Sequence, residues 1–249
     1  MQKILHFIRQ CAICFPGGGK LVHCVLGLLA RRAKAKRCAR LQRVGFEICN
    51  LIHNTLSQHK IAYFADHGTM LGIIRENGFI KHDEDMDFSI PPNVSLSQVW
   101  KALSPCGFSI VHGFAINGHL EEITLGYQGL TIDFFQCHAI GEKLGHYVFV
   151  SHYDHRTGNL LKVMAHERIR PPLQGLESKI FGELRKAQVA LPINAVEYLT
   201  ASYGNWQVPD SKSDFSSDKI PTQYRDICDG CEALDPSQTF QTFQTKIMV

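Results

Sequence analysis

Residues 66–90 read DHGTMLGIIRENGFIKHDEDMDFSI, and this stretch decides the fold expected for the rest of the chain. It opens with a small-residue turn that leads into a short helix, and after a second turn it closes with an alternating strand. Three aspartates, Asp83, Asp85 and Asp87, stand at alternate positions where that strand begins. Three uncompensated carboxylates so close together are electrostatically costly, so the stretch predicts a bound cation.

In the strand MDFSI at residues 86–90, Met86, Phe88 and Ile90 are expected to point into the core. Alternate side chains of a strand share a face, so Asp85 and Asp87 are expected on one face, roughly 6 to 7 Å apart. Together with Asp83 they can ligate Mg²⁺ or Mn²⁺, hard cations that prefer oxygen ligands. A solvated acidic turn is the simpler alternative, and the buried-looking alternation of the strand argues against it.

The turn His67-Gly68-Thr69 is a candidate substrate-binding element. Its backbone N–H groups and the positive end of the following helix suit a phosphate, so all three residues are assigned to substrate binding. Arg75 lies about two turns from Gly68 and could reach the same anion. A glycine turn before a helix is common, and the aspartate strand that follows strengthens the assignment.

A second acidic strand is predicted at residues 129–135, GLTIDFF, where Asp133 interrupts a run of strand-forming residues. A lone carboxylate in such a run is expensive to bury unless a cation meets it. By itself Asp133 would be a structural hydrogen-bonding residue. Beside the paired aspartates it becomes a candidate catalytic residue, as a further metal ligand or as a base for an attacking hydroxyl.

The rest of the pattern alternates helices and strands and predicts an α+β fold. Helical spacing of apolar residues covers 21–58, and further helices are expected at 95–104 and 194–203. The segment 178–192 fits either a helix or a hairpin, and no element is assigned after residue 208. Strands are predicted at 61–66, 86–90, 107–114, 120–127, 130–137 and 146–151.

Charge divides the chain of 249 residues into two regions. The first 46 residues hold ten Lys or Arg and no Asp or Glu, while the remainder holds sixteen basic and twenty-three acidic side chains. We predict a basic helical arm at 1–45 and a catalytic domain at 46–249. The arm suits peripheral contact with an anionic membrane, with a solvated helix as an equal alternative, and the acidic body argues against nucleic-acid binding.

No apolar stretch is long enough to span a bilayer, because LVHCVLGLLA at 21–30 ends at Arg31 and Arg32. The break at Pro16 and the basic run also argue against a secretory signal, so we expect a cytoplasmic protein, peripheral on the inner membrane face. The nine cysteines suit reduced thiols. Two CxxC pairs, Cys11 with Cys14 and Cys228 with Cys231, leave a zinc site as a minor alternative.

The motifs together resemble the LicD and fukutin-related family. The resemblance rests on HGTMLGIIR at 67–75, GFI at 78–80 and DEDMD at 83–87, with a closing element at Leu199, Tyr203-Gly204 and Trp206. It implies a nucleotidyltransferase-like fold of the polymerase-beta type, with a mixed sheet flanked by helices. It also implies divalent metal held by Asp83, Asp85 and Asp87, and transfer of phosphocholine or a phosphorylated polyol from a CDP-linked donor.

Residues and resemblance lead to one functional hypothesis and two alternatives. We expect metal-dependent transfer of the phosphorylated head group to a hydroxyl of a glycan or glycolipid acceptor, with release of CMP, as in lipopolysaccharide or capsule biosynthesis. One alternative is a true nucleotidyltransferase that acts on a small molecule and releases pyrophosphate. The other is a non-catalytic, membrane-associated binding module.

Overall fold

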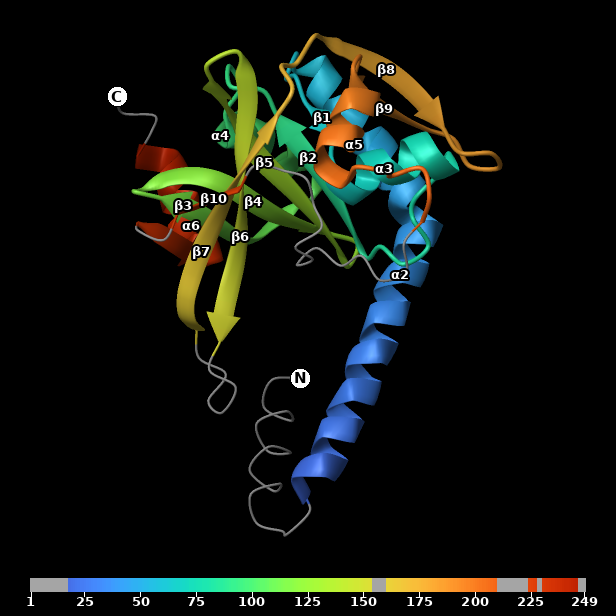
Figure 1. Ribbon diagram of the computed structural model, residues 1–249, viewed down its shortest axis with the longest axis vertical. Helices are drawn as coiled ribbons and strands as arrows, with labels where there is room; N and C mark the ends of the chain where they lie inside the picture. The colour runs from blue at the N-terminus through green and yellow to red at the C-terminus, as the bar shows by residue number, and fades with distance from the viewer. Residues whose placement is uncertain (1–17, 154–159, 210–223, 228–229, 246–249) are drawn as a thin grey trace.

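The computed structural model describes residues 18–153, 160–209, 224–227 and 230–245. Figure 1 shows a curved sheet with helices packed around it, which is the predicted α+β architecture of a mixed sheet flanked by helices. The elements in chain order are α2 (Gly18–Gln58), β1 (Phe64–Ala65), α3 (His67–Glu76), β2 (Asp85–Ile90), α4 (Leu96–Leu103), the 3-10 helix η1 (Ser104–Cys106), β3 (Ser109–Ile116), β4 (His119–Tyr127), β5 (Leu130–Ile140), β6 (Lys143–Tyr153), β7 (Leu160–Arg170), β8 (Leu176–Phe181), β9 (Ala187–Pro192), α5 (Ala195–Tyr203), β10 (Tyr224–Ile227), β11 (Cys231–Leu234) and α6 (Pro236–Thr245).

The main sheet contains nine of the strands in the described part of the chain. Strands β3 to β7 pair in sequence order, β10 extends the edge at β7, and β11 extends the edge at β3. All of these pairs are antiparallel. The acidic strand β2 instead pairs with β5 in parallel and with the short β1 on its other side, which makes the sheet mixed.

Strand β5 offers one edge to two partners in turn. Its residues 131–136 pair with β2, and its residues 137–140 pair with β6. The remaining residues of β6 cannot pair with β5, because β2 already pairs with residues 131–136 of that strand. They pair only with β7 and diverge from β5. Phe149 of β6 stacks on Phe114 of β3 with ring centroids 4.8 Å apart, which places β6 across the face of the sheet that carries Phe114.

The opposite face of the sheet carries the core. Met86 and Phe88 of β2 and Ile132 and Phe134 of β5 are completely buried, and the rings of Phe88 and Phe134 stack at 5.3 Å. Apolar side chains of α2 and α4 complete this layer: Leu41, Ile48, Ile52, Leu56, Val99 and Leu103. The alternation in β2 is therefore real, and Asp85 and Asp87 point away from the core.

Helix α2 is one continuous helix that begins outside the body of the protein and ends inside it. Figure 1 shows its N-terminal half extending away from the sheet, while Leu41 and the residues after it enter the core. The predicted boundary between residues 45 and 46 falls within this helix. Val25, Leu28 and Leu29 on the extended part are exposed. None of the described helices combines the length and the hydropathy that a bilayer span requires.

Most predicted elements are present near their predicted positions. The open choice at 178–192 resolves as a hairpin, β8 with β9. The long strand β7 was not predicted, and neither were the described elements after residue 208, which are β10, β11 and α6. The predicted strand at 61–66 is reduced to Phe64 and Ala65, and Asp66 is instead the N-cap residue of α3.

Candidate active site

Carboxylates from three adjacent strands lie on one face of the sheet. Asp87 of β2 and Asp133 of β5 are direct cross-strand partners, and Asp85 precedes them on the same face of β2. Strand β4 adds Glu122, which pairs with Phe135, two positions beyond Asp133 on β5. We call Asp83, Asp85, Asp87, Glu122 and Asp133 the carboxylate cluster. The sequence predicted four of its members, and the fold brings them together.

Burial and mutual repulsion make this cluster unfavourable in its fully ionised form. Burial, followed by the charges of Asp85 and Asp133, raises the pKa of Asp87 well above its ordinary value. Burial likewise raises the pKa of Asp133 to about 7, and burial with the nearby charge of Asp85 raises the pKa of Asp83 to about 6. The pKa of Glu122 rises through burial and the charge of Asp133. A cation between these groups would offset the repulsion.

Hydrogen bonds from neighbouring strands fix the position of Asp133. The hydroxyl of Thr124, its cross-strand partner on β4, donates to Oδ1 of Asp133 at 2.5 Å. The Thr124 oxygen in turn lies 3.0 Å from Nε2 of His112 on β3. One oxygen of Asp133 is therefore held by Thr124.

The turn 67–69 abuts the carboxylate cluster. The hydroxyl of Thr69 accepts a hydrogen bond from the backbone N–H of Asp87 at 2.9 Å, which ties α3 to β2. A Cβ atom on Gly68 would lie 2.7 Å from Oδ2 of Asp83, so a side chain there would displace that carboxylate. His67 is almost completely buried and has a positive φ of 43°. The phosphate-binding role of these residues stays a prediction.

Arg75 lies at the other end of α3 and has protein partners of its own. Its guanidinium group pairs with Glu76 at 2.7 Å and donates to the carbonyl oxygen of Trp206 at 3.2 Å. It lies near enough to Asp83 to lower the pKa of that carboxyl slightly against the larger effect of burial. Its predicted contact with phosphate is likewise untested.

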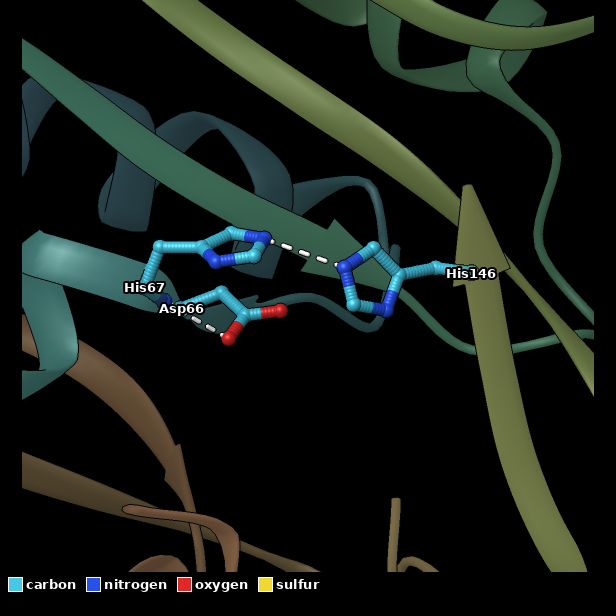
Figure 2. Close-up of side chains that lie close together, drawn as sticks. All are labelled: Asp66, His67 and His146. Atoms are coloured by element: carbon cyan, nitrogen blue, oxygen red, sulfur yellow. Dashed lines mark hydrogen bonds between the residues drawn. The ribbon is translucent and has the colours of Figure 1, made fainter. Parts of the chain in front are cut away.

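A basic group adjoins the turn on the side of β6 and β7. His67, His146, Arg168 and Arg170, which we call the basic cluster, are each at most 3% exposed. Nε2 of His67 and Nε2 of His146 lie 3.0 Å apart, and Figure 2 shows the two rings pointing toward each other beside Asp66. The basic cluster was missed in the sequence, apart from His67.

Asp66 anchors the basic cluster to α3. Its side chain caps the helix by accepting from the backbone N–H of His67 at 2.7 Å, and it accepts from the hydroxyl of Ser89 at 2.5 Å. It also forms a buried ion pair with Arg170. Despite burial, the favourable charge of Arg170 and the hydrogen bonds from Arg170 and Ser89 keep the pKa of Asp66 below its ordinary value.

Asp66, His67 and His146 offer ligand atoms within 4.8 Å of one another, a spacing that could hold a metal ion. The positive charge of Arg170 disfavours a cation at this position, because Arg170 already pairs with Asp66 and donates toward both histidine rings. Burial, followed by the charges of the arginines, also lowers the pKa of both histidines well below the ordinary value.

Charges from both clusters act on Tyr203. It lies at the end of α5, within the closing element predicted from the sequence. Burial raises the pKa of its hydroxyl, the charges of Arg168 and Arg170 oppose that rise, and the charge of Asp87 adds to it. His67 of the basic cluster directly precedes Gly68, which lies against Asp83, so the basic and carboxylate clusters are neighbours.

The suggested zinc site stays a prediction, because Cys11, Cys14 and Cys228 lie outside the described residues. Its fourth member, Cys231, lies on β11. Cys38, Cys49, Cys106 and Cys137 are free thiols, as the reduced state predicts.

Glu122, His146, Arg168 and Arg170 complete the site but were not singled out in the sequence. The signal for the arginines is the alternation in HERIR at 166–170, which places Arg168 and Arg170 on one face of a strand. Glu122 and His146 lie in strands that were predicted. Their neighbours in the site follow only from the way those strands pair, which the sequence does not give.

Comparison with known proteins supports the resemblance in the sequence. No curated protein matches the chain. Residues 60–166 match the family model described as LicD/FKTN/FKRP, nucleotidyltransferase domain. The matched segment includes the turn 67–69 and the carboxylate cluster, and it ends before Arg168 and Arg170. Over these residues the chain is therefore similar to the LicD family.

Proposed function

We propose that the protein transfers a phosphorylated head group, phosphocholine or a phosphorylated polyol, from a CDP-linked donor to a hydroxyl of a surface glycan or its precursor. The similarity of residues 60–166 to the LicD family supports a transferase that modifies glycans. The observation that carries the more specific proposal is the pairing of Asp87 with Asp133, flanked by Asp85 and Glu122, on one partly buried face. CMP would be the second product.

The carboxylate cluster fits a magnesium or manganese ion. Its donors are all carboxylate oxygens, and Mg²⁺ usually takes one or two carboxylates while water and substrate phosphates fill the remaining positions. Among the described carboxylates, no three oxygens lie within 4.8 Å of one another. A magnesium site that uses only one or two carboxylates does not require three. Asp85 and Asp87 would be the principal ligands, with Asp83 beside them. When bound, the ion would neutralise charge that develops on the diphosphate.

Asp133 is suited to act on the acceptor. With a pKa of about 7, it can accept a proton from a hydroxyl near neutral pH. Thr124 holds one of its oxygens, which leaves the other to orient the hydroxyl that attacks the distal phosphorus. The bond between that phosphorus and the bridging oxygen would break, and CMP would carry the bridging oxygen away.

A screen of CDP-linked donors tests this function. The protein is incubated with CDP-choline, CDP-ribitol or CDP-glycerol, an acceptor glycan and Mg²⁺, and release of CMP is measured by chromatography. Glu177→Gln, a change to an exposed side chain on β8, is a matched control that should retain activity. Release of CMP together with a modified glycan supports the proposal.

The same screen separates the alternative enzyme class. A true nucleotidyltransferase would use a nucleoside triphosphate and release pyrophosphate, which a coupled phosphate assay detects. Pyrophosphate release from CTP without CMP release from any CDP-linked donor would contradict the proposed function.

A further inference from the structure

Helix α2 carries an apolar and basic surface that has no part in the function proposed so far. We propose that this surface docks the protein on a membrane that contains anionic lipid. The residues that would make the contact are Val25, Leu28, Leu29, Arg32 and Lys36, which we call the outward stripe. Binding to lipid needs no catalysis, so it can be measured independently of the proposed function.

The outward stripe lies along one side of α2. Because an α-helix has about 3.6 residues per turn, the residues about one, two and three turns after Val25 share its side. All five side chains are exposed, and the exposed fractions are 38% for Val25, 52% for Leu28 and 46% for Leu29. Single exposed apolar residues are ordinary, whereas adjacent ones mark interaction surfaces. The first part of the stripe is therefore an apolar contact surface.

The opposite side of α2 is held by the body of the protein. Arg37, Cys38 and Leu41 lie roughly 120° to 220° around the helix from the middle of the stripe, at about 100° per residue. Nε of Arg37 donates to Glu84 at 2.6 Å. Leu41 is completely buried, and Sγ of Cys38 lies 3.4 Å from the carbonyl oxygen of His82. The outward stripe therefore faces away from the body, on the helix that Figure 1 shows extending from the sheet.

Charge selects an anionic partner for the stripe. Residues 18–46 contain eight basic side chains and no Asp or Glu: Lys20, Arg31, Arg32, Lys34, Lys36, Arg37, Arg40 and Arg43. Glu84 pairs with Arg37 and lies 4.0 Å from Lys34, on the opposite side of the helix. In the described part of the chain, Arg32 and Lys36 form no ion pair. Their charges are therefore available to lipid head groups.

The order of residues along the stripe favours a bilayer over nucleic acid. The apolar residues come first, and Arg32 and Lys36 follow about one and two turns later. At the interface of a bilayer, apolar side chains enter the acyl boundary while long basic side chains extend toward the phosphates. Nucleic acid would meet the charges but leave the three apolar side chains in water. The sequence LVHCVLGLLA at 21–30 contains no charged residue, which suits lipid around this end of the helix.

Co-sedimentation with vesicles tests the docking. The full chain is mixed, without Mg²⁺, with vesicles of phosphatidylcholine and with vesicles that also contain phosphatidylserine. We expect binding to the anionic vesicles, weaker binding to phosphatidylcholine alone, and a loss of affinity as salt is raised. Absence of binding to anionic vesicles, or equal affinity for both kinds, would overturn the inference.

Two double variants test the two halves of the stripe. Leu28→Ser with Leu29→Ser removes apolar area and should weaken binding to anionic vesicles at least about 10-fold. Arg32→Gln with Lys36→Gln should weaken it roughly 30-fold, as expected for two charges at the lipid surface. Near-native binding by either double variant would show that its half of the stripe does not contact lipid and would overturn the inference.

Matched controls separate a docking face from the net charge of the protein. Lys101→Gln with Lys143→Gln makes the same change in net charge at exposed positions of α4 and β6, and should weaken binding less than about 3-fold. Lys34→Gln, on the opposite side of α2, should cost about 2-fold, against about 5-fold for Lys36→Gln, because the helix diameter approaches the Debye length. A control that weakens binding as much as its matching stripe variant would show that no docking face exists.

A second copy of the chain on the stripe would give a different result. Light scattering without lipid should find the same molecular mass for the unchanged protein and for Leu28→Ser with Leu29→Ser. A dimer that only the unchanged protein forms would identify the stripe as a contact between two copies and would overturn the inference. Circular dichroism verifies that each variant is folded, and the comparison of vesicles with the unchanged protein decides if one is not.

Failure of the proposed function would look different. Vesicle binding that depends on the stripe, without CMP release from any CDP-linked donor, would leave the docking and remove the transferase. CMP release with a soluble acceptor, by a protein that binds no anionic vesicles, would leave the transferase and remove the docking.

Discussion

Asp133→Asn should make the metal-free protein more stable at alkaline pH. The substitution keeps the shape and an oxygen that can accept from Thr124, and it removes a charge that burial disfavours. The folded state raises the pKa of Asp133 from 3.8 to about 7. One pKa unit corresponds to about 1.4 kcal/mol, so ionised Asp133 costs the fold on the order of 4 kcal/mol once pH exceeds the folded pKa.

The sign of this effect gives a pH window. A raised carboxyl pKa means that the fold prefers the protonated form, so the free energy of unfolding falls as pH rises from about 4 to about 7. Urea denaturation in EDTA, followed by circular dichroism, should find the two proteins within about 1 kcal/mol at pH 4. At pH 8 the variant should be more stable by a few kcal/mol. Equal stability of the two proteins at both pH values would show that the fold does not disfavour ionised Asp133.

Three other changes probe separate parts of the account. Asp66→Ala leaves its arginine partner buried without a counter-charge and should lower the free energy of unfolding by about 3–5 kcal/mol, whereas a loss below about 1 kcal/mol in urea denaturation would show that the pair is not structural. Gly68→Ala places a Cβ 2.7 Å from the Asp83 carboxylate, so the concentration of Mg²⁺ needed for half-maximal activity should rise while the melting temperature changes little; an unchanged magnesium dependence would count against a role of Asp83 at the metal. For the arm, Arg31→Gln with Arg32→Gln should weaken co-sedimentation with phosphatidylserine vesicles roughly 30-fold, at about 1 kcal/mol for each charge, and equal sedimentation would rule out membrane contact at this position.

The sequence was sufficient for the part of the fold in which local pattern and burial agree. Residues 86–90 alternate because one face of β2 contacts the core, and the same signal identified β5 and its Asp133. Strand β7 was missed because LLKVMAHERIR mixes long charged side chains with apolar ones, and its two arginines are buried by contacts with distant elements. Pattern cannot reveal a charged side chain whose burial depends on a partner more than 100 residues away, as Arg170 depends on Asp66.

The candidate site was predictable to the same limit. Asp83, Asp85 and Asp87 are close in sequence, so their proximity needed no knowledge of the fold. The contact of Asp87 with Asp133 depends on the parallel pairing of β2 with β5, and Glu122 joins them through the antiparallel register of β4. To predict the basic cluster, one would also have to know that β6 diverges from the edge of β5 with which β2 pairs.

The most direct test of the central claim is the rate of CMP release by Asp87→Asn at saturating Mg²⁺. Asparagine keeps the shape at the centre of the carboxylate cluster but removes a charge that the metal requires. With the fold verified by circular dichroism, the account predicts that turnover falls by about two to three orders of magnitude relative to the unchanged protein. A near-native rate in the folded variant would show that the carboxylate cluster is not the catalytic metal site.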